Sequence, residues 1–268
     1  MSHPTALTIA GSDSGGGAGI QADLKAFSAL GVYGCSVITA LTAQNTQAVS
    51  GVMDVPADFI AGQLDAVFSD IDVHAVKIGM LSIPETIETV AAGLERHGAQ
   101  NVVLDPVMVA KSGDALLQPH AVDAVRDRLL PLADIITPNL PEAATLLERG
   151  AITSVSQMEE TAAALLKLGP KAVLLKGGHL EGEDSTDVLV TASGAEAFES
   201  RRVHTRNTHG TGCTLSSSIA AGLAKGNSLR EAVAAAKSYI GAAIAAADAL
   251  DIGQGHGPVH HFHQFWGK

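Results

Sequence analysis

Hydrophobic positions along the chain follow two alternating periods. Short apolar runs bounded by Gly, Pro or Asp predict strands at residues 6–10, 36–43, 75–78, 102–105, 135–137 and 172–176. Apolar residues at helical spacing predict amphipathic helices between them, at residues 21–30, 58–68, 85–95, 121–130, 139–148 and 157–168. Strands and helices that alternate in this way are typical of an α/β fold with a mostly parallel, doubly wound sheet.

The alternation changes after residue 184. Residues 187–191 and 197–202 flank a Ser193-Gly194 turn, which predicts an antiparallel hairpin at the edge of the sheet. Two Ala-rich helices, at residues 211–224 and 229–249, follow the hairpin. Ser156 and Glu159 predict a capping box at a helix start, and we expect residues 255–268 to form a loose tail whose histidines are solvated.

Composition supports a globular fold and argues against several classes of protein. Of 268 residues, 46% are hydrophobic, and this length favours one domain over residues 1–268. The net charge of -11 argues against a nucleic-acid-binding surface, which needs clustered Lys and Arg. No apolar run approaches the roughly 20 residues of a membrane span, so we expect a cytoplasmic protein that binds neither membrane nor nucleic acid. Cys35 and Cys213 are the two cysteines, and they form no Cys-x-x-Cys pair, so reduced thiols are expected.

A first glycine-rich loop, GSDSGGGAG at residues 11–19, lies between a predicted strand and a predicted helix. It does not fit the dinucleotide fingerprint G-x-G-x-x-G, because position 20 is Ile20, and Lys25 does not belong to a P-loop. Its glycines allow the backbone to approach a ligand closely. A tight turn from strand to helix is the alternative.

A second glycine-rich loop, THGTGCT at residues 208–214, begins a long predicted helix. Unpaired N–H groups and the helix dipole at such a start stabilise an anion such as a phosphate. The same field is expected to lower the pKa of Cys213 from about 8.5 toward neutrality, which makes this thiol a candidate proton acceptor. The alternative interpretation is a helix cap with a buried cysteine.

Further charged residues end predicted strands at the same edge of the sheet. Asp105 and Lys176 close two strands, and Asn139 and Glu142 begin the helix after a third. Open α/β sheets bind ligands at this edge. With the second loop, these residues predict a site for a phosphate and a metal ion.

Taken together, five motifs in order resemble those of a known family. They are GSDSGGGAGIQAD at 11–23, TALTAQNT at 39–46, DPVMVAKSG at 105–113, Asn139-x-x-Glu142 and GTGCT at 210–214. The chain resembles the ribokinase-like superfamily, and specifically its hydroxymethylpyrimidine/phosphomethylpyrimidine kinases of thiamine biosynthesis. The resemblance covers nearly the whole chain. It implies a three-layer fold, ATP as the phosphoryl donor, Mg²⁺, a small pyrimidine substrate and a homodimer.

The resemblance also implies roles for residues of this chain. The pyrimidine pocket is expected from Gly11, Ala18, Asp23, Gln44, Met80 and Val107, with the Gln44 amide reading the aminopyrimidine edge. ATP is expected at Lys176, Asn139, Thr208, Gly210 and Gly212, and Mg²⁺ at Glu142 and Asp105. Gly210, Thr211 and Gly212 are expected to form the anion hole, with Cys213 and Lys176 as catalytic residues. Ser112 and Gly113 belong to an expected flap that expels water.

The mechanism that the resemblance implies depends on the step. Relatives in the wider superfamily carry Asp where this chain has Cys213, so the thiolate is expected to accept the proton of the substrate's hydroxymethyl group. The second phosphorylation uses a phosphate oxygen that is already ionised near pH 7, and Cys213 is expected to matter less there.

The sequence is also compatible with other functions. A pyridoxal kinase of the same superfamily is the nearest, although residues 107–117 lack the second thiol that some of those enzymes carry. A pyrimidine-binding sensor without catalysis is more remote. A thiol hydrolase would pair Cys213 with His209, but His209 is expected to shape or cap the loop.

Overall fold

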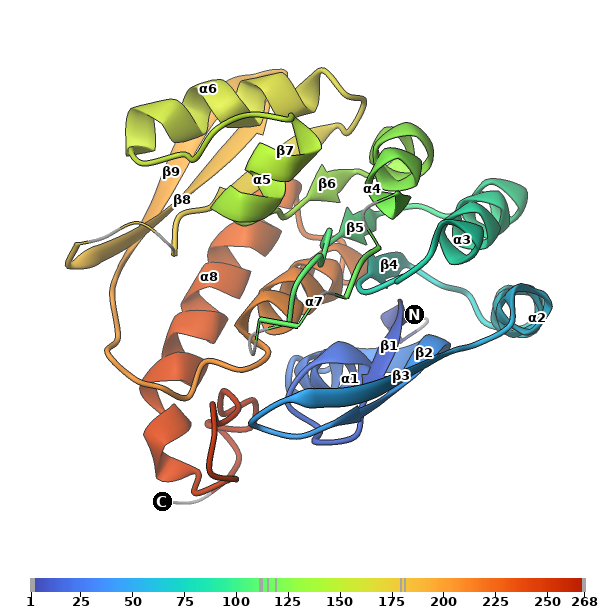
Figure 1. The fold of residues 1–268 in the computed structure, drawn as a ribbon, viewed down its shortest axis with the longest axis horizontal. Coiled ribbons are helices and arrows are strands. Elements are labelled where there is room, and N and C mark those ends of the chain that lie inside the picture. The colour runs from blue at the N-terminus through green and yellow to red at the C-terminus, as the bar shows by residue number, and fades with distance from the viewer. Residues whose placement is uncertain are drawn as a thin grey trace.

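One nine-stranded sheet organises the part of the chain that the structure describes. The computed structural model describes residues 3–110, 113–114, 116–118, 120–178, 180 and 182–266. The strands lie in the order β3-β2-β1-β4-β5-β6-β7-β8-β9 across the sheet (Figure 1). Their bounds are β1 Thr5–Asp13, β2 Tyr33–Gln44, β3 Val49–Asp54, β4 Ala75–Ile78, β5 Val102–Leu104, β6 Ile135–Ile136, β7 Ala172–Lys176, β8 Asp184–Thr191 and β9 Gly194–Arg201.

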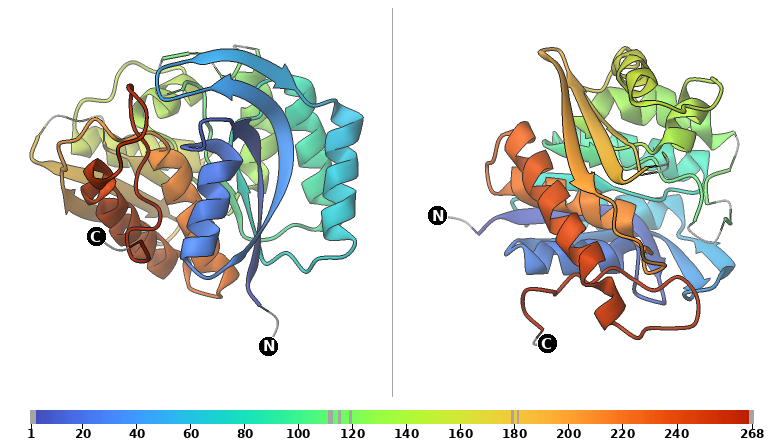
Figure 2. Two further views of the ribbon diagram at one scale, coloured as in Figure 1. Left: turned by 90° about the horizontal axis from the view of Figure 1, so that it is seen from below. Right: turned by 90° about the vertical axis from the view of Figure 1, so that its left-hand side faces the viewer.

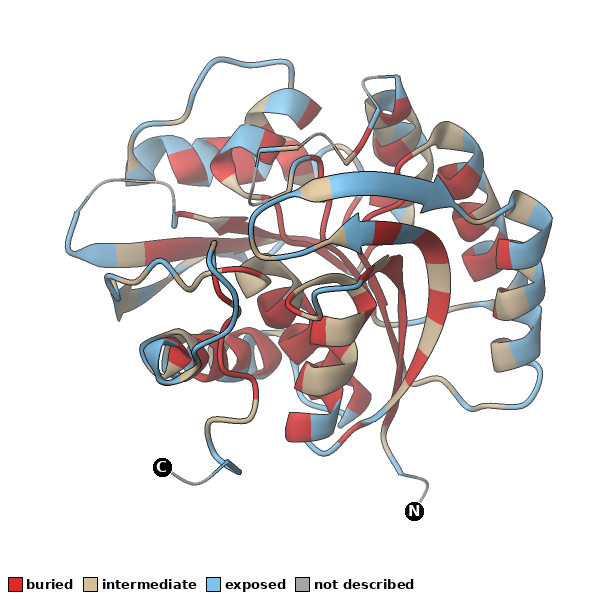
Figure 3. Ribbon diagram, turned by 60° about the horizontal axis from the view of Figure 1, so that its bottom comes forward, coloured by how far each residue is buried: buried red, intermediate tan, exposed pale blue. Residues whose placement is uncertain are grey.

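The centre of the sheet is parallel and both of its edges are antiparallel. The strands from β2 through β7 pair in parallel, and the buried pattern of β1, β4 and β5 fits strands that are covered on both faces. The predicted hairpin is confirmed as β8 and β9. Strand β3, which pairs with β2 at the other edge, was not predicted. Figure 3 shows why: β3 is exposed along most of its length, so its sequence carries no buried alternation.

Helices cover both faces of the sheet, as expected for a three-layer fold (Figure 2). Their bounds are α1 Gly19–Ala29, α2 Ala57–Phe68, α3 Pro84–His97, α4 Ala121–Ala124, α5 Leu140–Leu146, α6 Val155–Leu166, α7 Thr211–Ala224 and α8 Leu229–Ala245. One apolar core lies between the sheet and helices α2 to α6, and a second lies between the sheet and helices α1, α7 and α8. The core therefore fixes the sheet from both sides, and the loops at its ends remain available for ligands.

One local prediction about helices was wrong, and a second predicted helix is present but irregular. Helix α6 is capped by Ser154, whose side chain accepts from the Gln157 N–H, and not by Ser156 with Glu159. The helix predicted at residues 121–130 is a short α4 followed by a π-helical turn, Val125–Leu129, and a 3-10 turn, Leu130–Leu132. Pro131 lacks the N–H that an α-helix would require there.

The carboxyl ends of the parallel strands open into a crevice. Strand β1 lies between β2 and β4. Strands β2 and β3 lie on one side of β1, and strands β4 to β9 follow one another on its other side. Loops after β1 and β4 therefore diverge at this switch point, which is the general ligand site of open α/β sheets. The two glycine-rich loops both reach this edge, because the second one begins α7, which packs against β1, β4 and β5.

Candidate active site

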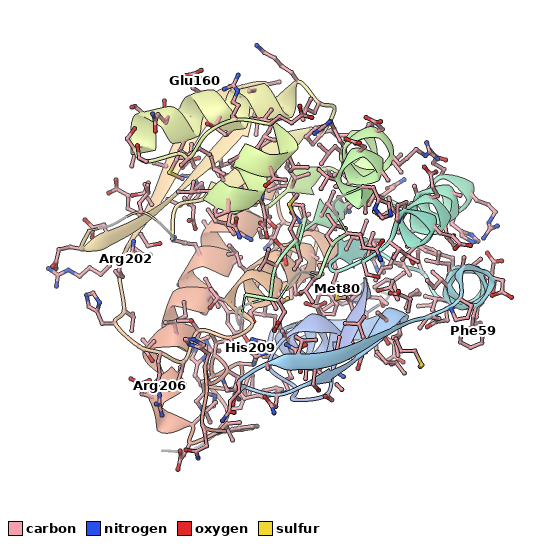
Figure 4. All side chains as sticks on the ribbon, in the orientation of Figure 1. Phe59, Met80, Glu160, Arg202, Arg206 and His209 are labelled. Carbon is pink, nitrogen blue, oxygen red and sulfur yellow. The ribbon has the colours of Figure 1, made fainter. Side chains whose placement is uncertain are left out.

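A cavity of about 690 Å³ lies at the carboxyl edge of the sheet. It is lined by all but one of the residues that the sequence and the resemblance assigned to the site. These are Gly11, Ala18, Gln44, Met80, Asp105, Val107, Asn139, Glu142, Lys176, Thr208, Gly210, Thr211, Gly212 and Cys213. Figure 4 shows Met80 and His209 near the middle of the molecule, with Phe59 far out at the α2 edge. Residues that are distant in sequence thus share one wall.

Asp13 organises the first glycine-rich loop. Its carboxylate accepts hydrogen bonds from the backbone N–H groups of Gly15 (2.7 Å), Gly17 (3.0 Å) and Ala18 (2.8 Å). The same carboxylate lies 2.9 Å from Nε2 of the buried His209. Although burial acts in the opposite direction, these hydrogen bonds lower the pKa of Asp13. The loop is therefore held by a buried anion and is more than a simple turn.

His209 is a site residue whose role sequence reasoning missed. Because a carboxylate can only accept, Nε2 of His209 donates its hydrogen to Asp13. Gln44 Nε2 lies 3.5 Å from the same nitrogen, and Gln44 Oε1 accepts from Thr42 Oγ1 at 3.0 Å. His209 cannot also accept from Gln44, so the Gln44 amide keeps donors for a ligand in the cavity. The motif gave no signal of this contact between loops far apart in sequence.

The two glycine-rich loops touch directly. Gly210 has φ +78, and a Cβ at this position would lie 1.8 Å from the Gly17 carbonyl oxygen. A Cβ at Gly17 would lie 2.3 Å from Cδ2 of His209. Helix α7 begins at Thr211, immediately after Gly210, and its first residues, Thr211, Gly212 and Cys213, line the cavity. This arrangement suits an anion.

The predicted pKa shift of Cys213 was wrong in direction. Burial raises the pKa of Cys213 to about 11, although the nearby Lys77 ammonium and a hydrogen bond from the Gly19 N–H act to lower it. The loss of hydration therefore outweighs the field at the start of α7. Without ligands, Cys213 carries a protonated thiol at neutral pH.

Asp105, Lys176 and Glu142 form a charged cluster beside the start of α7. Lys176 Nζ donates to Asp105 Oδ1 at 2.8 Å, and Thr137 Oγ1 donates to the same oxygen at 3.0 Å. A Cβ on Gly212 would lie 3.4 Å from both Asp105 Oδ2 and Lys176 Nζ. Despite burial, the two lysines Lys176 and Lys77 lower the pKa of Asp105. The cluster thus places an ionised carboxylate and an ammonium at the anion site.

The pKa of the Glu142 carboxyl shifts upward, opposite to that of Asp105. Burial raises the pKa of Glu142 to about 7, and the Asp105 charge adds to this, while Lys176 opposes it. Glu142 and Asn139 form the predicted helix start as a complete capping box: Glu142 Oε2 accepts from the Asn139 N–H at 2.7 Å, and Asn139 Oδ1 accepts from the Glu142 N–H at 2.8 Å. Helix capping therefore fixes this carboxylate in the cavity wall.

These carboxylates suit a hard cation held mainly by other ligands. Over the described residues, no group of three or more His, Cys, Asp or Glu side chains is arranged to hold a metal. Mg²⁺ requires less than this, because it keeps several waters and is usually bound by one or two carboxylates together with phosphates. Asp105 and Glu142 both reach the cavity and supply oxygen donors. The residues present thus fit Mg²⁺ that arrives with a phosphate ligand.

Asp23, which the resemblance assigns to the pyrimidine pocket, does not line the cavity. Its carboxylate is fully buried and accepts from Lys77 Nζ (2.8 Å) and Thr8 Oγ1 (2.6 Å), and from the Ser217 hydroxyl. A carboxylate buried at a helix face must be paired, which explains this network. Asp23 thus joins α1, β1, β4 and α7 beneath the site.

The outer part of the cavity was also missed by the sequence reasoning. It is lined by Asp187 of β8 and by Lys237 and Ile240 of α8. Lys237 Nζ lies 2.6 Å from Asp187 Oδ2, and Asp187 Oδ1 accepts from the Gly177 N–H at 3.0 Å. These residues carry no motif, and the fold alone brings the edge hairpin and the last helix to the cavity. Ser112 of the expected flap lies outside the described residues.

Comparison with known proteins agrees with this geometry. The family model described as phosphomethylpyrimidine kinase matches residues 13–260. The hydroxymethylpyrimidine/phosphomethylpyrimidine kinase of Rhizobium meliloti is 61% identical over 261 residues, which cover 97% of this chain and 98% of the relative. The solved phosphomethylpyrimidine kinase of Clostridium difficile is 49% identical with a TM-score of 0.80, covering 90% of this chain and 99% of that one.

A pyridoxal kinase is also similar in structure. The enzyme of Bacillus subtilis, solved as an ADP complex, is 41% identical with a TM-score of 0.91 and covers 98% of this chain and 99% of its own. The predicted ribokinase-like α/β fold is confirmed by these neighbours. Among the described helices, none has the length and apolar character needed to cross a membrane. The chain is a kinase, and it belongs to the phosphomethylpyrimidine kinase family.

Proposed function

We propose that the protein transfers the γ-phosphoryl group of ATP to 4-amino-5-hydroxymethyl-2-methylpyrimidine and then to the resulting monophosphate, for thiamine biosynthesis. The observation that carries this proposal is the shared cavity. Its wall includes Gln44, whose amide keeps a donor, together with Met80 and Val107, and it also includes the N-terminus of α7 and Lys176. A small aminopyrimidine bound at Gln44 would share one cavity with the anion site, toward which its hydroxymethyl group would point.

Gln44 supplies the recognition step of this proposal. A neutral amide can donate and accept at once, which matches a ring nitrogen next to an exocyclic amine. Asp13 and His209 hold each other and the Gly17 backbone, so the surface beneath the pyrimidine is rigid before substrate binds. Such preorganisation holds the reacting oxygen in position.

Phosphoryl transfer in this site is mainly electrostatic. The N–H groups of Gly210 and Gly212 at the start of α7 would hold the transferring phosphoryl group, and Lys176 would neutralise its charge. The Thr211 N–H donates to the Thr208 carbonyl oxygen at 3.3 Å and would have to exchange that bond to join them. Asp105 and Glu142 would hold Mg²⁺, which when bound neutralises charge on the phosphates. Asn139 and Thr208 line the cavity where the nucleotide phosphates would lie. Asp187 and Lys237 support its outer wall, where the nucleoside would lie.

Cys213 is proposed as the base for the alcohol step only. Its thiol must lose a proton before it can accept one, and burial in the free protein opposes this loss. Lys77 and the Gly19 N–H are the groups that favour the thiolate. The monophosphate brings an already ionised oxygen, so the second transfer proceeds without this base.

Pyridoxal is the second candidate acceptor, and the similarity to a pyridoxal kinase is the observation that favours it. Pyridoxal also presents a hydroxymethyl group on a small heteroaromatic ring. Purified protein with Mg-ATP and each acceptor in turn separates the two functions by the rate of ADP release. Faster turnover of pyridoxal than of the pyrimidine alcohol would overturn the first proposal. Absence of ADP release with every acceptor would leave a binding protein instead.

Residues 1–268 are proposed to act as one kinase domain in the cytoplasm, as a homodimer. The sheet edge formed by β3 and the neighbouring α2 exposes Val52, Met53 and Phe59, with between 46% and 65% of each residue exposed. Such an apolar edge favours a second subunit. Mass measurement in solution tests the dimer, and a monomer at micromolar concentration would contradict it.

A further inference from the structure

The C-terminal segment packs against both halves of the candidate site. We call residues 253–261 the strap. The expectation that residues 255–268 form a loose tail with solvated histidines was wrong, because Val259, His260 and His261 are at most 7% exposed. Figure 1 shows the strap between the lower end of α8 and the tip of the β2–β3 hairpin. A loose tail would not bury histidines, so the strap is an ordered part of the fold.

The strap begins on the loop that follows Gln44. The Gly255 N–H donates to Thr46 Oγ1 at 3.1 Å, and the His256 N–H donates to the Thr46 carbonyl oxygen at 2.8 Å. The approach is close enough that a Cβ on Gly255 would lie 2.0 Å from the Thr46 carbonyl oxygen. Glycine therefore permits a backbone contact just two residues beyond the amide proposed to read the pyrimidine.

The strap then pairs with the loop before the anion site. The Gly257 N–H donates to Asn207 Oδ1 at 3.1 Å, and the His209 N–H donates to the Gly257 carbonyl oxygen at 3.0 Å. The Val259 N–H returns a hydrogen bond to the His209 carbonyl oxygen at 3.3 Å. These bonds fix the backbone of His209, whose side chain binds Asp13 and faces Gln44.

The strap ends on the first turn of α7. His261 Nε2 lies 2.9 Å from Thr214 Oγ1, and that hydroxyl donates its single hydrogen to the Gly210 carbonyl oxygen at 2.7 Å. His261 must therefore be the donor, which requires hydrogen on Nε2. Tyr239 Oη donates to the His261 carbonyl oxygen at 2.7 Å and holds its backbone. The chain of bonds from His261 to Gly210 thus reaches the cap of the anion-binding helix.

We propose that the strap is a positioning element that joins the pyrimidine end of the site to its anion end, with His261 as the positioning residue for Gly210 through Thr214. This inference rests on the proposed function of the same site. Two loops that must hold one substrate between them are tied by one segment, so a change at either end shifts the geometry at the other. Misplacement of reacting groups by about 1 Å lowers rates by about 100-fold.

Four variants test the strap by steady-state kinetics with the pyrimidine alcohol and its monophosphate. His261→Leu removes the donor, and His261→Gln keeps an N–H donor at a similar reach. Thr46→Val removes the acceptor hydroxyl at the other end with little change of volume. His263→Leu is the control: its Nδ1 lies 3.0 Å from the His260 carbonyl oxygen and its Nε2 is buried without a hydrogen-bond partner, and among the described residues its side chain contacts neither glycine-rich loop.

His261→Leu is expected to lower kcat for both acceptors by about 10- to 100-fold with little change in the KM for ATP, and His261→Gln to restore most of it. His263→Leu is expected to keep wild-type kcat. In the double variant of Thr46 and His261 the losses in kcat/KM are expected to be much smaller than their product, which shows coupling.

Three outcomes would overturn the proposed role of the strap. They are losses of kcat/KM that multiply in the double variant, equal losses of kcat in His261→Leu and His263→Leu, and failure of His261→Gln to recover activity. If His261→Leu does not fold, the cycle of Thr46→Val with His261→Gln carries the same test. Wild-type protein that phosphorylates neither pyrimidine acceptor would refute the proposed function instead, so the two failures are distinguishable.

Discussion

Glu142→Gln is expected to stabilise the free protein while it destroys activity. Glu142 is a buried carboxyl that contributes to the capping box of α5 and lies in the cavity wall. Glutamine can accept the same hydrogen bond from the Asn139 N–H, so the helix start is retained. What changes is the negative charge, which burial and Asp105 disfavour in the absence of a metal ion.

The magnitude follows from the pKa. A carboxyl whose pKa rises from 4.5 to about 7 on folding binds more protons in the native state than in the unfolded state between those values. The free energy of unfolding therefore falls as pH increases through this window, by about 3 kcal/mol in all. Because glutamine has no proton to lose, Glu142→Gln removes this loss of stability at high pH. The variant should exceed wild type by less than about 1 kcal/mol at pH 5 and by about 3 kcal/mol at pH 8.5.

Thermal unfolding of both proteins without ligands, at pH 5 and pH 8.5, measures the effect. For a domain of this size the gain at pH 8.5 corresponds to a Tm increase on the order of 5 to 10 °C. In parallel, kcat with saturating Mg-ATP is expected to fall by about 100-fold or more, because a ligand for the cation is lost. A variant with the same Tm difference at both pH values, or a less stable variant at pH 8.5, would refute this reasoning.

Three further predictions concern the base, the anion loop and the buried ion pair. Cys213→Ala should lower the rate of phosphorylation of the alcohol by about 100-fold or more and that of the monophosphate far less. In the wild-type protein, only the rate with the alcohol should rise between pH 7 and pH 9, because the Cys213 thiol has a pKa of about 11. Equal losses in both steps would exclude the base role. Gly210→Ala should abolish phosphoryl transfer or folding, because the new Cβ would collide with the Gly17 carbonyl oxygen. Gly226→Ala is the control: this glycine has φ +83 and open space around it, so the substitution should cost about 1 kcal/mol of stability and no activity. Equal activity of both variants would contradict this prediction. Lys77→Met should cost about 3 to 5 kcal/mol in denaturant unfolding, and adding Asp23→Asn should recover part of it, because one buried charge without its partner is worse than none; additive losses would argue against pairing.

Much of the fold could be predicted because its periodicity is strong. The central parallel strands are buried on both faces and read as continuous apolar runs, and the hairpin has a clear turn at Gly194. Strand β3 could not be predicted, because an exposed edge strand needs no apolar alternation. The strap could not be predicted either, since its order comes from backbone hydrogen bonds to Thr46 and His209 rather than from its own pattern.

The site was predictable as far as its residues lie in motifs at strand and helix ends. Topology brings such ends together, so Asp105, Glu142 and Lys176 could be grouped without a structure. Charge balance was not predictable in this way. The direction in which the Cys213 pKa shifts depends on burial, and the position of Asp23 in α1 depends on Lys77 in β4, four elements further along the chain. Both depend on tertiary packing, which local sequence does not record.

The central claim is that this cavity phosphorylates a hydroxymethyl aminopyrimidine. The most direct measurement compares kcat/KM for the pyrimidine alcohol, its monophosphate and pyridoxal, with Mg-ATP and with product identity established by mass spectrometry. The account predicts a monophosphate and then a diphosphate of the pyrimidine, with pyridoxal the poorest acceptor. Preferred turnover of pyridoxal, or no phosphorylated pyrimidine at all, would contradict it.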